Sequence, residues 1–162
     1  MMLLRCMGVM LAVGWLIAGS GLVLANPAED TVHVWFKALN SRPFDEVRVA
    51  DLLSDELDDH NNEDLFLSDK AIQIYIQQEY AKGAPNAHIN LLMVDALKDG
   101  RVLAHWRFSG KHTAEMFEIP ATNKPFDITG MTIFRVAEGK ITEVWQVMEF
   151  ARLLEQLGVL DG

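Results

Sequence analysis

The chain has 162 residues, half of them apolar and 23% charged, a composition typical of one globular domain. Its formal net charge of -9 argues against a nucleic-acid partner, which would need a basic surface. The same acidity gives little attraction to anionic membranes and mainly favours solubility.

The first 25 residues predict a secretory signal peptide. Arg5 begins an otherwise uncharged apolar run, and Val23-Leu24-Ala25 places small or β-branched residues where a signal peptidase cleaves. We therefore expect a single mature domain over residues 26–162, secreted or periplasmic and free of the membrane. Cys6, the only cysteine, would be removed, which leaves no disulfide or thiol chemistry. An uncleaved membrane anchor is the alternative, because the run is long enough to span a bilayer.

Helical patterns dominate the N-terminal half. The expected helices begin at Asp30, Asp45 and Ser68 and end near Arg42, Leu53 and Gly83. Asp30 and Ser68 are N-cap residue types, the residue before Pro43 avoids the helical region, and Gly83 suits a helix C-cap. The polar residues 55–62 predict a loop between the second and third helices.

Strand patterns dominate the C-terminal half. The expected strands cover residues 88–97, 101–109, 111–118, 125–136 and 140–150. Asp99-Gly100 is a turn signal, and Gly130 within the fourth strand predicts a bulge or sharp bend. A short helix over residues 152–157, ended by Gly158, closes the chain.

Helices followed by hairpin-linked strands predict an α+β fold rather than an alternating α/β fold. Consecutive strands with tight turns make an antiparallel sheet. Such a sheet can curve around the helices into a cone, which would enclose an apolar pocket for a small hydrophobic ligand.

The sequence contains no motif for metal or covalent chemistry. Its five histidines lack metal-ligand spacing, no glycine-rich loop follows a strand, and no serine stands in a nucleophile-elbow motif. We therefore expect no metal and no cofactor. Acid–base chemistry by carboxylates and histidines, or binding without chemistry, remains.

Glu149 is the first candidate for acid–base chemistry. It shares a strand face with Trp145 and Val147, which we expect to be buried. A carboxyl group in an apolar cavity has a raised pKa, which suits a general base near neutral pH. In the alternative interpretation, Glu149 is a polar strand end or a first-turn carboxylate favoured by the dipole of the last helix. Glu143 shares the face but lies nearer the turn, at the rim.

The histidines are weaker candidates. His105 and Trp106 are neighbours on one strand and point to opposite faces, and we expect Trp106 to face the core. His112 follows Gly110, where the chain can bend. His60 lies in the polar loop, where pairing with a neighbouring aspartate is the simpler interpretation.

A series of short motifs resembles the SnoaL-like polyketide cyclases, also called ester cyclases. In the C-terminal half they are Asp99-Gly100-Arg101-Val102, Trp106, Gly110-Lys111-His112-Thr113, Ile119-Pro120, Ile133-Phe134-Arg135, Gly139-Lys140-Ile141-Thr142-Glu143, Trp145 and Gln156-Leu157-Gly158. Asp59-His60 and Ala84-Pro85-Asn86 add to them, so the resemblance spans roughly Asp30 to Leu160.

The resemblance implies the α+β cone shared with nuclear transport factor, ketosteroid isomerases and scytalone dehydratase. It places Glu149 where the family usually has a catalytic Asp, and Val144 where the family has a His. His112, with His60 as a further candidate, would stabilise a developing oxyanion. The residues expected to shape the ligand pocket are Trp145, Trp106, His105, Phe117 and Met131.

Two functions follow from the resemblance and the residues. One is cyclase- or isomerase-type proton transfer on a small hydrophobic carbonyl compound. The other is a non-catalytic periplasmic binding or accessory protein that uses the same pocket, because this fold hosts enzymes and binders alike. In either case, a homodimer through the outer face of the sheet is a candidate assembly.

Overall fold

The computed structural model describes residues 26–61 and 68–160. The predicted signal peptide lies outside them. In chain order the elements are α1 (Pro27–Leu39), α2 (Glu46–Leu52), β1 (Leu53–Asp59), α3 (Asp69–Gly83), β2 (His88–Ala96), β3 (Val102–Lys111), β4 (Pro125–Ala137), β5 (Lys140–Met148) and α4 (Phe150–Leu157). The strands form one sheet in the order β1-β5-β4-β3-β2.

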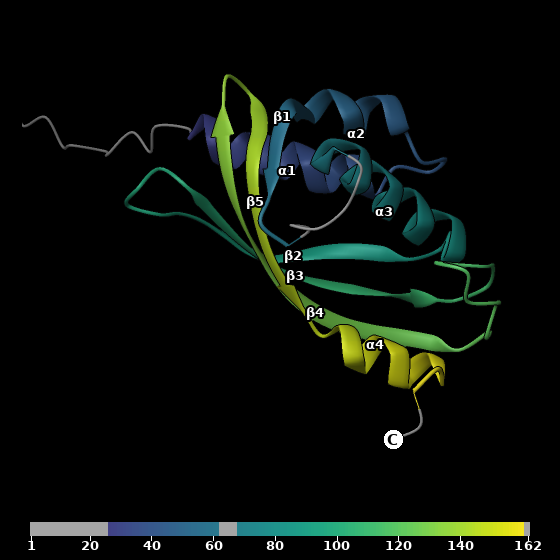
Figure 1. Ribbon diagram of the computed structural model, residues 1–162. Coiled ribbons are helices and arrows are strands. Elements are labelled where there is room, and N and C mark those ends of the chain that lie inside the picture. Colours follow the sequence, from purple (N-terminus) through teal and green to yellow (C-terminus); the bar gives the residue numbers. More distant parts are fainter. Residues whose placement is uncertain (1–25, 62–67, 161–162) are drawn as a thin grey trace, which may run out of the picture.

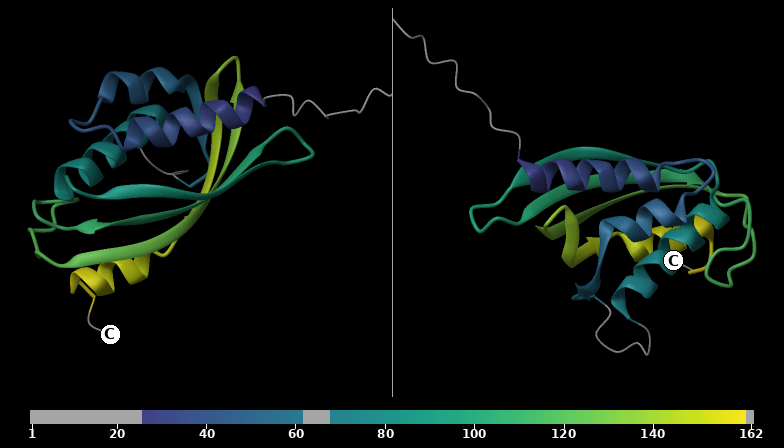
Figure 2. Two further views of the ribbon diagram at one scale, coloured as in Figure 1. Left: turned by 180° about the vertical axis from the view of Figure 1, so that it is seen from behind. Right: turned by 90° about the horizontal axis from the view of Figure 1, so that it is seen from above.

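The sheet curves around three of the helices, which confirms the predicted α+β cone. Helices α1, α2 and α3 lie on its concave side, and α4 lies on the other side beside β4 (Figure 1). The view from behind shows the helices and the curved sheet as two layers (Figure 2). Buried apolar side chains from α1 and from strands β3 and β4, among them Trp35, Phe36, Phe108 and Phe134, form the core between these layers. Among the described residues no helix is long and apolar enough to cross a membrane.

Strand β1 corrects the prediction of a loop over residues 55–62. Residues 53–59 pair in parallel with β5, with Leu53 opposite Ile141 and Asp59 opposite Val144. Leu57 and Asp59 turn inward and are buried, whereas Asp55, Glu56 and Asp58 stay at the surface. The acidic composition hid the strand, because only one of its faces is buried.

The helix ends differ from the predicted ones in two places. The N-cap of α1 is Asn26, whose side chain accepts from the Ala28 N–H at 3.1 Å, rather than Asp30. Ser68 caps α3 as predicted. Gly83 is the last residue of α3 and not its C-cap. A Cβ atom there would lie 2.3 Å from Cβ of Met116, so the glycine is needed for close packing.

The third predicted strand, residues 111–118, is not a strand. Strand β3 continues to Lys111, and the chain then forms a tight turn with a single bridge between Met116 and Ile119. Phe117 and Glu118 adopt φ angles of 49° and 63°, in the left-handed region that no strand residue occupies. The prediction was wrong because apolar content alone does not show the backbone conformation.

Gly130 forms no bulge. It lies in a continuous ladder opposite Trp106 on β3 and Met148 on β5. A Cβ atom at this position would lie 2.3 Å from Cζ2 of Trp106. The glycine therefore makes room for the indole ring on the concave face of the sheet.

Candidate functional site

A pocket opens between the concave face of the sheet and helices α1 and α3. It contains about 610 Å³ of empty space, part of which is open to solvent. It is lined by Trp35, Phe36, Leu39, Leu53, Gln73, Gln77, Tyr80, Ile89, Trp106, Phe108, Thr132, Phe134, Ile141, Val144, Gln146 and Met148. Such a mostly apolar cavity with a few polar groups is typical of small-molecule sites.

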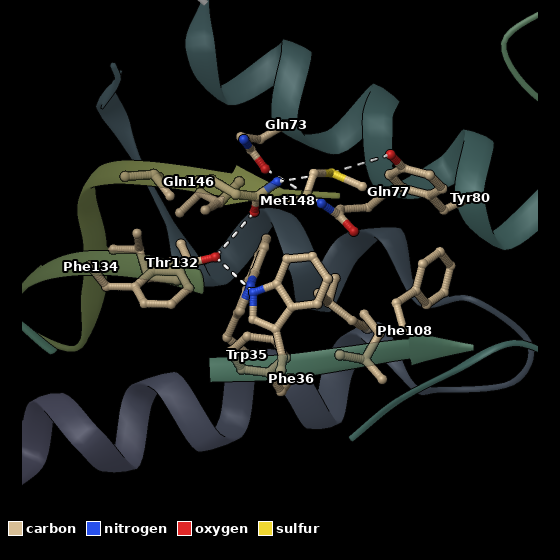
Figure 3. A pocket seen from close by; sticks show the side chains of 16 residues that line it. Trp35, Phe36, Gln73, Gln77, Tyr80, Phe108, Thr132, Phe134, Gln146 and Met148 are labelled. Atoms are coloured by element: carbon tan, nitrogen blue, oxygen red, sulfur yellow. Dashed lines mark hydrogen bonds between the residues drawn. The ribbon is translucent and has the colours of Figure 1, made fainter. Parts of the chain in front are cut away.

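The polar side chains gather on one side of the pocket. Figure 3 shows the glutamines with Met148 and Tyr80 on one side, and the rings of Trp35 and Phe36 on the other. A ligand between them would contact apolar rings on one side and amide groups on the other.

One hydrogen-bond chain begins at Trp106. Its indole N–H donates to Oγ1 of Thr132 at 2.9 Å, and the Thr132 hydroxyl donates to Oε1 of Gln146 at 3.1 Å. An indole N–H is a donor only, so it determines the direction of the whole chain. The amide NH₂ of Gln146 is therefore the end of this chain.

Two donors then meet at one sulfur atom. Nε2 of Gln146 lies 3.7 Å from Sδ of Met148, and the Tyr80 hydroxyl lies 3.8 Å from the same sulfur. A thioether is a weak acceptor, so both donors are poorly satisfied. Burial raises the pKa of Tyr80 to about 12, so its hydroxyl remains a neutral donor over the physiological range.

A second chain begins at Asp59, behind the pocket wall. Oδ2 of Asp59 accepts from Nε2 of Gln73 at 2.6 Å, and Oε1 of Gln73 accepts from Nε2 of Gln77 at 3.5 Å. Both glutamines line the pocket, but Asp59 does not. Among the described lining residues there is no Asp, Glu, His, Lys or Arg, so the part of the pocket wall that they form is uncharged.

Glu149 lies outside this pocket, as the N-cap residue of α4, with a side chain that is 37% exposed. Its Oε2 accepts from the backbone N–H of Thr129 at 2.7 Å, and its Oε1 accepts from Arg152 at 3.0 Å. The Thr129 N–H, followed by Arg152, lowers the pKa of Glu149. The predicted raised pKa is therefore wrong, because donors that hold the carboxylate in its charged form outweigh the desolvation that would raise its pKa.

The reason for these contacts is the free edge of β4. Strand β5 pairs with β4 only from Gly130 onward, so the preceding residues of β4 have no strand partner on that side among the described residues. Glu149 accepts from the Thr129 N–H, and Oε1 of Gln156 accepts from the Asp127 N–H at 2.7 Å. These two side chains, one from the N-cap of α4 and one from its last turn, replace the missing strand and protect the edge.

The strand face that carries Glu149 is the outer face. Val147 is 70% exposed, contrary to the predicted burial.

Trp145 is only partly buried and is covered by His60, whose ring stacks on the indole with centroids 4.3 Å apart and planes at 6°. Cζ of Arg101 lies 5.1 Å from the same Trp145 ring. Nε2 of His60 also lies 3.4 Å from Glu143 and 3.5 Å from Asp58. His60 and Trp145 therefore stabilise the outer surface and do not line the pocket.

His112 is fully buried, but in the turn region after β3. Its Nδ1 lies 3.1 Å from Oγ1 of Thr122, and its Nε2 has no hydrogen-bond partner among the described residues. Burial lowers the pKa of His112, so the ring is neutral at physiological pH. The structure thus places Glu149, His112 and His60 in three separate regions, and their catalytic roles stay predictions.

The residues predicted to bind a ligand also lie in different regions of the structure. Trp106 lines the pocket, and Phe117 packs edge-on against Tyr80 behind it, with centroids 5.1 Å apart. His105 and Met131 lie on the outer face, where they line a shallow hollow with Val147. Whether the outer face forms a homodimer stays a prediction.

The residues that the sequence interpretation missed are Gln73, Gln77, Tyr80 and Gln146. A signal for them was present. Gln73, Gln77 and Tyr80 recur at the spacing that places side chains on one helix face, and Gln146 alternates with Trp145 and Val147. Choosing the wrong face of β5 as the buried one hid Gln146.

The fold is an α+β cone, and a mostly apolar pocket lies between its sheet and its helices. The model of the SnoaL-like polyketide cyclase family matches residues 30–157, so the chain belongs to this family. Among the curated proteins, none matches the chain.

Several solved structures share the fold. A putative hydroxylase, AclR, from Streptomyces galilaeus has 21% identity and a TM-score of 0.71, with 83% of each chain covered. TsrD from Streptomyces laurentii has 20% identity and a TM-score of 0.71, over 83% of this chain and 96% of that one. A putative polyketide cyclase from Bacillus cereus has 21% identity and a TM-score of 0.66, over 81% and 80%. At these identities the likeness shows the nuclear-transport-factor-like cone fold and no more.

Proposed function

We propose that the pocket binds a small, uncharged, largely apolar carbonyl compound. The observation that carries this proposal is the convergence of two neutral donors, Tyr80 and Gln146, on the Met148 sulfur. A carbonyl oxygen is a much better acceptor than a thioether, so a ligand that offers one at this point gains two hydrogen bonds.

The uncharged pocket wall supports an uncharged ligand. An ionised carboxylate or amine would lose its hydration without meeting an opposite charge among the described lining residues. The rings of Trp35, Phe36 and Trp106 would supply the apolar contact. These features favour a ketone, ester or similar neutral compound with an aromatic or aliphatic body.

Proton transfer of the cyclase or isomerase type is the second candidate, and one observation favours it. A donor pair that holds a ketone oxygen also stabilises the enolate formed when solvent water or hydroxide takes up a neighbouring α-proton. The similar structure from Bacillus cereus is named a putative polyketide cyclase, which is consistent with enolate chemistry. Glu149 would need to act from outside the pocket, so binding without Glu149-dependent chemistry is the first choice.

Binding is tested with a matched pair of probes, 4-phenyl-2-butanone and butylbenzene, by NMR titration of the purified protein. The ketone should bind about tenfold more tightly than the hydrocarbon, the effect of one or two net hydrogen bonds. Tyr80→Phe and Gln146→Leu should each reduce this preference. Tyr75→Phe is the matched control, because Tyr75 is on the same helix but 48% exposed and outside the pocket. Equal binding of ketone and hydrocarbon would refute the proposal.

Proton transfer is tested separately with the same ketone in D₂O, by following exchange of its α-protons by NMR. Acceleration by the wild-type protein that Tyr80→Phe reduces would establish the second candidate. Glu149→Gln should leave the exchange unchanged, and a loss in that variant would restore Glu149 as the base.

Export remains part of the proposal. The predicted signal segment would deliver the domain out of the cytoplasm, and an apolar ligand could reach it there. N-terminal sequencing of protein recovered from the producing cell would test this, with Asn26 as the expected first residue.

A further inference from the structure

A buried carboxylate outside the pocket determines how one pocket side chain is oriented. Asp59, at the end of β1, is 2% exposed. Its Oδ1 accepts from the backbone N–H of Asn61 at 3.0 Å, and its Oδ2 accepts from Nε2 of Gln73 at 2.6 Å. Both contacts use the carboxylate as an acceptor only.

The orientation passes along helix α3 from one glutamine to the next. Because the carboxylate only accepts, Gln73 must turn its NH₂ group to Asp59 and its oxygen toward Gln77. The NH₂ group of Gln77 donates to the oxygen of Gln73, which leaves Oε1 of Gln77 free to face the pocket. Oε1 of Gln77 accepts no hydrogen bond from the described residues.

The amide of Gln146 has the opposite orientation to that of Gln77, because it turns its NH₂ group rather than its oxygen toward the pocket. The indole of Trp106, a donor only, acts through Thr132 and leaves Gln146 with its NH₂ group toward Met148. The pocket therefore offers an acceptor at Gln77 and donors at Gln146 and Tyr80. Figure 3 shows these three side chains on the same side of the pocket.

We infer that Asp59 is a positioning residue that makes the pocket select a neutral ligand with a hydroxyl group in addition to its carbonyl group. The ligand hydroxyl would donate to Oε1 of Gln77, while Gln146 and Tyr80 hold the carbonyl oxygen. This inference rests on the proposed function and adds the second polar group of the ligand.

The test uses three probes with the same skeleton. They are 4-hydroxy-4-phenyl-2-butanone, its methyl ether, and 4-phenyl-2-butanone, which lacks the oxygen. By NMR titration, the wild-type protein should bind the hydroxy ketone about three- to tenfold more tightly than the other two, the effect of one hydrogen bond. The ether separates donation by the hydroxyl from a gain in size or polarity.

Asp59→Asn should reverse the orientation without changing the size of the side chain. The Asn61 N–H can only donate, so the new amide keeps its oxygen there and turns its NH₂ group to Gln73. Gln73 and Gln77 then turn over in sequence, and Gln77 presents a donor. The ratio of the affinities for the hydroxy ketone and the ether should fall to about one or below. If Asp59 had a purely structural role, its substitution would weaken the binding of all three probes equally.

Two further variants complete the test. Asp58→Asn is the control, because Asp58 is 61% exposed and its carboxylate contacts His60 outside the pocket; this variant should keep the wild-type preference. Gln77→Met removes the acceptor directly and should abolish the preference even if Asp59→Asn does not fold. Equal binding of the three probes to the wild type, or an unchanged preference in folded Asp59→Asn, would overturn the inference and leave carbonyl binding intact. Failure of every ketone to bind would overturn the proposed function itself.

Discussion

The two faces of strand β5 differ in charge: the inner face carries neutral side chains, and the outer face carries charged ones. The inner face presents Val144, Gln146 and Met148 to the pocket, where the polar contacts come from neutral groups. The outer face carries Glu143, which pairs with Arg135 and lies near His60. Alternation along a single strand thus separates a neutral surface that lines the pocket from a charged outer surface.

The difference follows from solvation. A charge on the inner face would lose water and have no nearby counter-ion, whereas on the outer face it keeps part of its hydration and gains a partner. A general base was expected beside Trp145, but the residues on that side form ion pairs and cover the sheet edge. The polar groups that can recognise a ligand are amides and hydroxyls on the opposite side.

Truncating one side chain on each side of the sheet tests this contrast most strongly. Phe134 is 2% exposed and lines the pocket, so Phe134→Ala should cost about 3–5 kcal/mol of unfolding free energy. Val147→Ala on the outer face should change it by less than about 0.5 kcal/mol. Urea unfolding followed by circular dichroism measures both. A similar cost for the two variants would contradict the assignment of the faces.

Gly130→Ala tests the inner face with the smallest added group. The new methyl would overlap the Trp106 ring, so the indole must move and its hydrogen bond to Thr132 at 2.9 Å would be disturbed. We expect a loss of about 1–3 kcal/mol, the usual cost of overpacking. Gly100→Ala is the comparison for crowding, because nothing lies within 4 Å of its Cβ position, although its φ of 83° brings strain of its own. A shifted Trp106 indole resonance in Gly130→Ala alone would identify the ring as the cause.

The sequence predicts the fold better than the site. Hydrophobic periodicity located the main helices and four of the five strands, because these segments bury one continuous face. It missed β1, whose buried positions alternate with carboxylates, and it placed a strand at Phe117, where the backbone is left-handed.

The site is harder to predict from the sequence. The alternation of side chains along a strand shows which residues share a face but not which face is buried. On β5 both faces carry apolar residues, Trp145 and Val147 on one and Val144 and Met148 on the other. Only pairing with β4 and β1 decides between them. The orientation of Gln77 depends on Asp59, 18 residues earlier in the chain, and no local pattern contains that information.

Gln156→Ala tests the edge protection on the outer side. Gln156 accepts from the Asp127 N–H at 2.7 Å and donates to the Asp127 carbonyl at 3.0 Å. Loss of these bonds should cost about 1 kcal/mol and speed hydrogen exchange of the Asp127 amide. Glu155→Ala, on the exposed side of the same helix, should leave that exchange rate unchanged. Equal exchange in the two variants would show that α4 does not protect this edge.

Glu149→Gln should have the smallest effect at neutral pH, since the new amide oxygen can still accept from the Thr129 N–H. The pH dependence is the sharper measurement. The pKa of Glu149 is lowered in the folded protein, first by the Thr129 N–H and then by Arg152, so the charged carboxylate adds stability above its unfolded pKa of about 4.5. That contribution disappears as the pH falls through the lower folded pKa. The melting temperatures of wild type and variant should therefore differ at pH 7 and converge in acid. A base with a raised pKa would behave in the opposite way: its carboxylate would destabilise the folded state at pH 7, and Glu149→Gln would then raise the melting temperature.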